Sequence, residues 1–252
     1  GNMYLHDIGT TDTLQVADLT SANGNIIFTA DRTTVAEKLS TEHGTMNYQI
    51  HGDFTAEKLK AEGRTDITAD GDVDIKSDGD LILGRVEAGE EENRKNIKIN
   101  VKGGNLLNGL EAEETSQTNL TGKDITLNAT SETADGTGNL GTADKWLVLE
   151  TKGRLEADAA GNMWLEDVRT QKPEEGTWNV GHLVSGSEDG EIHLKSARDT
   201  AIYELIAGMI DLDIDGMAYV MSSGSLNGTI KSKGLNLKAD SIGAKAEESE
   251  EG

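Results

Sequence analysis

The chain repeats itself over a long span, and this repeat constrains its fold more than any other feature. Residues 1–8 read GNMYLHDI and residues 161–168 read GNMWLEDV. The likeness continues between residues 14–52 and 178–216, and the offset between equivalent positions changes only from 160 to 166 over the whole span. Added residues form polar stretches such as 172–176 (KPEEG), as expected when insertions enter surface loops and leave a stacked core intact. The sequence therefore predicts a repeat array.

Apolar and polar residues alternate in short bursts along the chain, as in Met46-x-Tyr48-x-Ile50 and Ile210-x-Leu212-x-Ile214. Glycine, or a Gly-Asp or Gly-Asn pair, precedes many of the bursts. A period of two is typical of strands, because successive side chains point to opposite faces. Only residues 34–39, 54–61 and 201–207 resemble helices, at about one turn each.

The spacing of the bursts predicts the architecture. Equivalent starts at Gly1, Gly24 and Gly44 lie 20 to 23 residues apart, which is enough for about three short strands and three turns. Such a unit fits one rung of a β-solenoid, and roughly eleven rungs stacked at about 4.8 Å would form a rod about 50 Å long. A β-sandwich is the competing architecture, but it does not predict a long repeat whose insertions are confined to turns.

The expected organisation is one repeat array with a short tail. Residues 1–244 form the array, and the charged residues 245–252, without an apolar face, are expected to be an acidic disordered tail. Three longer polar intervals, at 87–96, 111–119 and 131–141, are expected to be loops that leave the coil. Because the chain opens inside a repeat unit, we expect a fragment of a longer protein.

The net charge of the chain argues against several classes of partner. The chain has 46 acidic and 23 basic residues and a formal net charge of −23, which disfavours binding to nucleic acid or anionic lipid. No run of eighteen apolar residues is present, so we expect no membrane insertion. The absence of cysteine excludes disulfides and cysteine-based metal sites.

Two motifs suggest ligands but are better explained as turns and strands. Residues 136–141 match G-x-G-x-x-G, yet the following residues 146–149 are expected to form a strand and not the helix that a dinucleotide site requires. Residues 70–80 carry a run of aspartates that resembles the start of a calcium loop, but Ile75 and Leu81 stand where that loop needs glycine and glutamate. Weak calcium binding at stacked turns stays open as an alternative.

No catalytic constellation is recognisable. The histidines show neither His-x-His nor His-x-x-x-His spacing, and no G-x-S-x-G motif occurs. Paired carboxylates could serve as general acid and base, but the sequence does not nominate a pair. We therefore predict no catalytic, cofactor-binding or metal-binding residues and no cofactor. The N-x-[ST] patterns are explained by the abundance of Asn and Thr; they begin at Asn119, Asn128 and Asn227.

Four aromatic residues are candidates for stacking on sugar rings: Tyr4, Trp146, Trp164 and Trp178. Strand parity places Met3 and Leu5 inside, so Tyr4 and its counterpart Trp164 point outward, as does Trp146. Outward aromatic rings can stack on sugars. The alternative is that they cover a neighbouring turn or loop.

The repeat pattern resembles the repeat region of large filamentous-haemagglutinin-like exoproteins of Gram-negative-type bacteria. The residues that carry the resemblance are 124–129 (DITLNA), 138–144 (GNLGTAD), 155–166 (LEADAAGNMWLE) and 190–197 (GEIHLKSA). The resemblance implies a right-handed parallel β-helix, two-partner secretion through an outer-membrane partner, and a stalk or adhesive role at the outer surface of a diderm bacterium.

These observations lead to a structural and adhesive hypothesis. The chain is expected to be a secreted or surface-exposed β-helical rod without catalysis, part of an adhesin that binds host glycans or cell-surface proteins. The alternatives are a β-helical polysaccharide-degrading enzyme, either lyase or glycosidase, and the stalk of a contact-dependent toxin-delivery protein. Short turns and net acidity argue against the enzyme, because a groove for acidic sugars needs long loops and basic residues.

Overall fold

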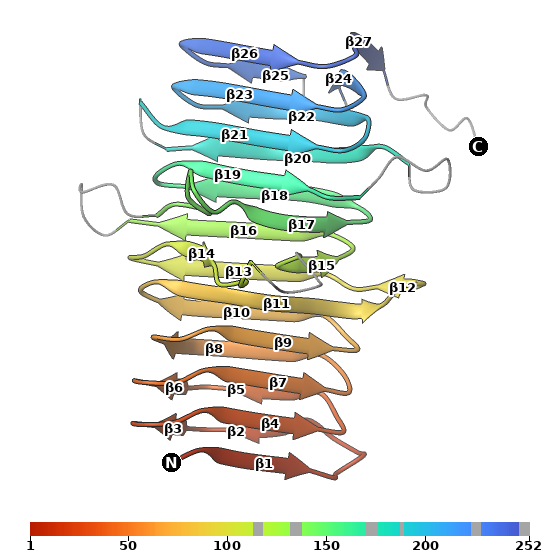
Figure 1. Ribbon diagram of the computed structural model, residues 1–252. Helices are drawn as coiled ribbons and strands as arrows, with labels where there is room; N and C mark the ends of the chain where they lie inside the picture. Colours follow the sequence, from red (N-terminus) through yellow and green to blue (C-terminus); the bar gives the residue numbers. More distant parts are fainter. Residues whose placement is uncertain (113–117, 132–137, 170–175, 187–188, 223–227, 247–252) are drawn as a thin grey trace.

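The computed structural model is an all-β rod made of stacked rungs (Figure 1). The structure describes residues 1–112, 118–131, 138–169, 176–186, 189–222 and 228–246. Each rung contributes strand to two long sheets, named sheet A and sheet B, and no helix occurs in these described residues. The predicted parallel β-helix is confirmed.

Sheet A follows the order in which its strands occur along the chain. Its path is β1 (Met3–Asp7), β4 (Ile26–Ala30), β7 (Met46–Ile50), β9 (Thr65–Ala69), β11 (Leu81–Glu90), β15 (Leu120–Gly122), β17 (Leu147–Thr151), β19 (Met163–Asp167), β21 (Glu191–Ser196), β23 (Met209–Ile214) and β26 (Gly234–Lys238). Two short strands pair with β11 beside this path, β12 (Asn93–Arg94) and β14 (Leu106–Asn108).

Sheet B is built in the same way from the alternate strands. Its path is β2 (Leu14–Val16), β5 (Thr34–Ala36), β8 (Phe54–Ala61), β10 (Val73–Asp78), β13 (Ile97–Lys102), β16 (Ile125–Thr130), β18 (Arg154–Ala159), β20 (Trp178–Ser185), β22 (Thr200–Ile206), β24 (Met217–Ser222) and β27 (Ser241–Ala246). Off this path lie β3 (Leu19–Ser21), β6 (Leu39–Thr41) and β25 (Thr229–Lys231).

The path of each sheet holds eleven strands, which agrees with the predicted number of rungs. Within the described residues every strand pair is parallel except β11 with β12, so the sandwich alternative is wrong. The first two rungs have three strands each, as do the rung with β14, β15 and β16 and the rung with β23, β24 and β25. In the first rung β2 and β3 lie in the same sheet, and in the third rung the equivalent residues form the continuous strand β8.

The two copies of the repeat occupy equivalent places in the rod. β1 is the first and β19 the eighth strand along sheet A, and the copies therefore lie seven rungs apart. The equivalent pairs β4 and β21, and β7 and β23, also lie in sheet A, whereas β2 and β20 lie in sheet B. The sequence repeat is thus a repeat of position as well.

The three segments that resembled helices are strands, and the prediction of helical turns there was wrong. Residues 34–39 lie in β5 and its continuation to β6, residues 54–61 form β8, and residues 201–207 lie largely in β22. In β8 the buried residues Ala56 and Leu59 are three positions apart, because the register with β10 shifts between them. A three-residue step between buried positions imitates helical spacing.

Glycine and asparagine stack at the turn that leads into sheet A. A Cβ on Gly44 would lie 2.4 Å from the carbonyl oxygen of Gly24, so only glycine fits this close backbone contact. The side chain of Asn139 accepts the amide N–H of Asn162 at 2.7 Å, and Asn139 donates its own amide to Asn105 at 2.9 Å. These contacts explain the Gly and Asn residues that precede the strands.

The predicted loops and tail are only partly as expected. In the interval 87–96, residues 87–90 are the end of β11 and residues 93–94 form β12. These two segments pair as an antiparallel hairpin that projects from the rod (Figure 1). The centres of the other two intervals, 113–117 and 132–137, lie outside the described residues. β27 ends at Ala246, two residues beyond the predicted end of the array.

Candidate functional site

An outward-facing cluster on sheet A combines two tryptophans, a histidine and a lysine. Trp164 of β19 lies opposite His193 of β21 in the parallel register. Trp146 directly precedes β17, whose Leu147 pairs with Leu165, so Trp146 lies next to Trp164. We refer to Trp146, Trp164, His193 and Lys195 as the aromatic patch.

The rings of the patch contact one another closely. The indole of Trp164 and the imidazole of His193 are stacked, with centroids 5.7 Å apart and planes 3° from parallel. Trp146 meets the same imidazole edge to face at 6.2 Å and 66°. The ammonium nitrogen of Lys195 lies 4.2 Å from the centroid of the Trp146 ring, within cation–π distance. Both tryptophans are half-buried.

The patch lies where the seventh rung departs from regular strand geometry. Leu140 bridges Leu106 and Met163, and the strand resumes only at Leu147. Between them, Thr142 and Lys145 exchange backbone hydrogen bonds of 3.0 and 3.1 Å and close a turn. The indole N–H of Trp146 donates to the carbonyl of Ala143 at 3.2 Å, which fixes the ring beside this turn.

Carboxylates border the patch. The carboxylate of Glu191 lies 2.9 Å from Nε2 of His193, and that of Asp211 lies 3.5 Å from its Nδ1. Glu166 is opposite Lys195 in the register of β19 and β21. Asp213 lies opposite Lys195 on the other side, and accepts a hydrogen bond of 2.6 Å from Lys238, which raises the pKa of that lysine.

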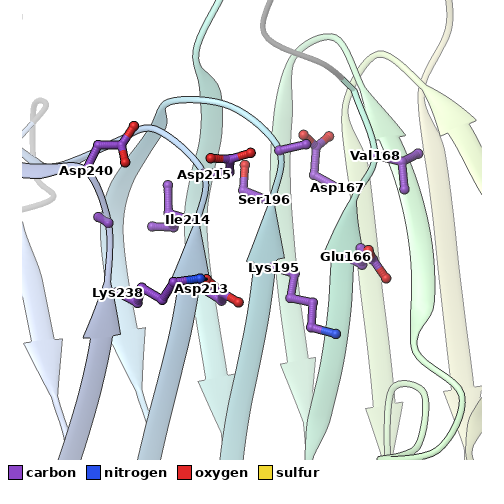
Figure 2. Close-up of a pocket in the computed structure, with 12 residues that line it drawn as sticks. Glu166, Asp167, Val168, Lys195, Ser196, Asp213, Ile214, Asp215, Lys238 and Asp240 are labelled. Carbon is purple, nitrogen blue, oxygen red and sulfur yellow. The ribbon is translucent and has the colours of Figure 1, made fainter.

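A shallow groove of about 570 Å³ adjoins the patch, at the edge where the sheet A strands turn towards sheet B. Figure 2 shows Glu166, Lys195, Asp213 and Lys238 along one side of it, and Asp167, Asp215 and Asp240 along the turn. Lys195 therefore belongs to both the patch and the groove, and Glu166 and Asp213 line the groove beside it.

Asp167 and Arg198 form a buried ion pair under this groove. Arg198 donates to both carboxylate oxygens of Asp167, at 2.8 and 3.0 Å, and also to the carbonyl of Thr151 at 2.8 Å. Burial raises the pKa of Asp167 to about 6, although the Arg198 guanidinium lowers it. Because Asp167 is fully buried and both its oxygens are occupied, its role is to join three successive turns.

The four residues predicted to stack on sugars occupy different positions in the structure. Trp146 and Trp164 face outward and lie together. Tyr4 is 69% exposed on the first rung, far from the patch along sheet A. Trp178 is only 1% exposed and belongs to the core, so its nomination for stacking on an external sugar was wrong. The sequence repeat already indicates this orientation, because Trp178 aligns with Leu14, an apolar residue at an inward position of the first copy.

Sequence reasoning missed His193 and Lys195. Both belong to β21, and their neighbours across the sheet are known only once the register between rungs is fixed. Parity along β21 places them outward, because Ile192 and Leu194 are buried. That signal was available, but nothing in the sequence places His193 against Trp164.

Two of the aspartates that resembled a calcium loop accept hydrogen bonds from backbone amides. Asp72 accepts the amide N–H of Asn96 at 2.8 Å, and Asp80 accepts that of Asn105 at 2.7 Å. Asp70 lies 2.9 Å from Nδ1 of His51. In the part of the chain that the structure describes, no group of three or more histidine and carboxylate side chains is placed to hold a metal.

The sequon at Asn119 is also structural. Asn119 is buried, and its side-chain amide donates to the carbonyls of Leu83 and Gly84, both at 3.0 Å. Its side-chain oxygen accepts the amide N–H of Val148, again at 3.0 Å. The side chain thus joins neighbouring rungs in place of a missing stretch of regular strand.

The fold and the patch together define a parallel β-helix with an aromatic and acidic surface on one sheet. Comparison with known proteins finds no matching family model, curated protein or solved structure. A helix long and apolar enough to cross a membrane is absent from the described residues.

Proposed function

We propose that the chain is a non-catalytic rod segment of a secreted or surface-exposed bacterial adhesin, and that its aromatic patch binds glycans. The parent protein would reach the outer face of a diderm cell through an outer-membrane secretion partner. The observation that carries the proposal is the position of the patch. Two outward tryptophans lie together where the seventh rung departs from its regular course, and such departures commonly carry function in repeat proteins.

The chemistry of the patch suits a sugar. Indole rings pack against the C–H face of a pyranose, and carboxylates accept hydrogen bonds from its hydroxyl groups. Glu166 and Asp213 flank Lys195 within this surface and could serve as acceptors. The rod itself supplies rigidity, because each rung pairs along its length with the next.

A polysaccharide-degrading enzyme is the competing function, and the raised pKa of Asp167 is the observation in its favour. A general acid must reach the glycosidic oxygen, however, and Asp167 is buried with both oxygens bound to Arg198. We therefore favour the binding function.

A glycan array with purified chain tests the proposal. Trp146→Ala and Trp164→Ala should each weaken the strongest signals about tenfold, because an aromatic platform contributes roughly 1–1.5 kcal/mol. Tyr4→Ala is the matched control, since Tyr4 is an outward aromatic on the same sheet at another rung. An array without binders, or equal losses in all three variants, would contradict the glycan-binding role. Release of reducing sugar from any polysaccharide would overturn the non-catalytic role.

A further inference from the structure

The aromatic patch already holds a cation. The ammonium group of Lys195 lies over the ring of Trp146, 4.2 Å from its centroid. Tryptophan is the most favourable aromatic partner for an ammonium ion, because its electron-rich face attracts positive charge. Lys195 is exposed and its side chain is long and flexible. A cation from outside could therefore replace its ammonium group on the Trp146 ring.

The surroundings of the ring are acidic. Glu166, Glu191, Asp211 and Asp213 face outward from β19, β21 and β23 around the patch. Against these carboxylates stand the ammonium groups of Lys195 and Lys238 and the imidazole of His193, which lies between Glu191 and Asp211. An anionic sugar is repelled by this arrangement, whereas a cationic one is attracted.

The groove extends the same character beyond the rings. Asp215 and Asp240 line its turn edge, and both side chains are exposed. In Figure 2 their carboxylates lie along the turn, above the side chains of Asp213 and Lys238. The volume of about 570 Å³ is sufficient for further sugar units of a ligand that begins on the patch.

We infer that the patch selects glycans with free amino groups, that is, oligomers of hexosamine whose nitrogen is not acetylated. This inference rests on the proposed glycan binding and specifies its ligand. The pyranose C–H face packs on Trp146, the protonated amine takes the place of the Lys195 ammonium, and the carboxylate of Glu166, which is opposite Lys195 in the register, binds that amine.

Paired oligosaccharides test the selectivity. Calorimetric titration at pH 6.5 compares glucosamine oligomers with N-acetylglucosamine oligomers of equal length. We expect the free amine to bind at least about fivefold more tightly, and the advantage to shrink at high salt. At pH 9 the primary amine should lose this advantage, whereas an N-trimethylated oligomer should keep it, because its charge does not titrate.

Removal of Lys195 supplies a sharper test, because the expected effect is a gain. Lys195→Ser vacates the face of Trp146 and should strengthen binding of the amino sugar about fivefold. Lys98→Ser, an exposed lysine of β13 on sheet B, changes the net charge equally and should leave affinity unchanged. Trp146→Ala should reduce binding of the amino sugar at least about tenfold.

The outcomes separate this inference from the proposed function. Equal binding of acetylated and free oligomers would leave glycan binding in place but overturn the selectivity. Weaker binding by Lys195→Ser would also overturn it, because Lys195 would then be a ligand for the sugar and not its competitor. Failure of every oligosaccharide to bind, together with an empty glycan array, would overturn both.

Discussion

Replacement of Arg198 by methionine tests whether the buried ion pair fastens the turns of rungs seven to nine. The side chains of Arg198 and Asp167 are 1% and 0% exposed, and the guanidinium also bonds to the Thr151 carbonyl. Methionine fills similar volume but leaves the Asp167 carboxylate buried without its partner. Removal of one member of a buried pair costs about 3–5 kcal/mol.

The loss should be local, because each rung of a solenoid contacts chiefly its neighbours. Hydrogen exchange measured by mass spectrometry should therefore show opening free energies lower by about 3–5 kcal/mol in peptides from β17, β19 and β22. Peptides from β4 and β7 should keep their protection. The thermal transition of the affected region should move down by roughly 10 °C.

Arg32→Met is the matched control, because Arg32 makes the same two contacts with Asp7 in the first copy. There the side chains are 22% and 21% exposed, so water can solvate the carboxylate that remains. The double variant Asp167→Leu/Arg198→Met removes both charges and should recover most of the lost stability. Equal effects of Arg198→Met and Arg32→Met would refute the argument from burial.

Two further predictions concern pH and the glycine stack. Because the pKa of Asp167 is about 6 in the folded chain and about 3.9 when unfolded, its contribution to stability is present below pH 4 and lost as pH rises through 6. Asp167→Asn should therefore reduce the change in melting temperature between pH 4 and 6. The same change in the variant as in the parent chain would contradict the assignment of this pKa to Asp167. Gly44→Ala places a Cβ 2.4 Å from the Gly24 carbonyl and should cost about 1–3 kcal/mol by chemical denaturation, whereas Gly1→Ala, with open space around it, should be neutral.

Much of the frame was predictable because inward and outward residues alternate strictly in many of the strands, as in β4, β9, β13 and β19. Met163 and Leu165 are buried and Trp164 between them faces outward, as parity requires. The prediction of helical turns failed for a physical reason, which residues 54–61 illustrate. Parity assumes regular pleating, and the three-residue step between Ala56 and Leu59 breaks it on sheet B. A single sequence does not distinguish that step from a helical turn.

The patch was only half predictable because it depends on contacts between rungs. Trp146 and Trp164 are eighteen residues apart, and their proximity requires the excursion at residues 141–146 to return in register with β19. The ring of Trp164 meets His193 only because β19 and β21 pair without a shift. These are properties of the stack, and no local pattern encodes them.

The two copies also show that a repeated sequence need not repeat its chemistry. In the first copy the hydrogen bonds from Arg32 hold the pKa of Asp7 below its usual value. In the second copy the same pair lies between further rungs, and burial raises the pKa of Asp167 instead. The neighbouring rungs, and not the pair itself, decide the direction of the shift.

The outward positions have diverged in a corresponding way. Tyr4 and Ile27 of the first copy are adjacent on sheet A, at the positions that Trp164 and His193 occupy in the second. The inward residues, in contrast, stay apolar in both copies, as Met3 and Met163 illustrate. Packing therefore fixes one face of each strand while the other is free to acquire ligand chemistry. On this reasoning the aromatic patch is a feature of the second copy alone, and grafting Trp and His at positions 4 and 27, without the excursion that holds Trp146, should not create amino-sugar binding at the first rung.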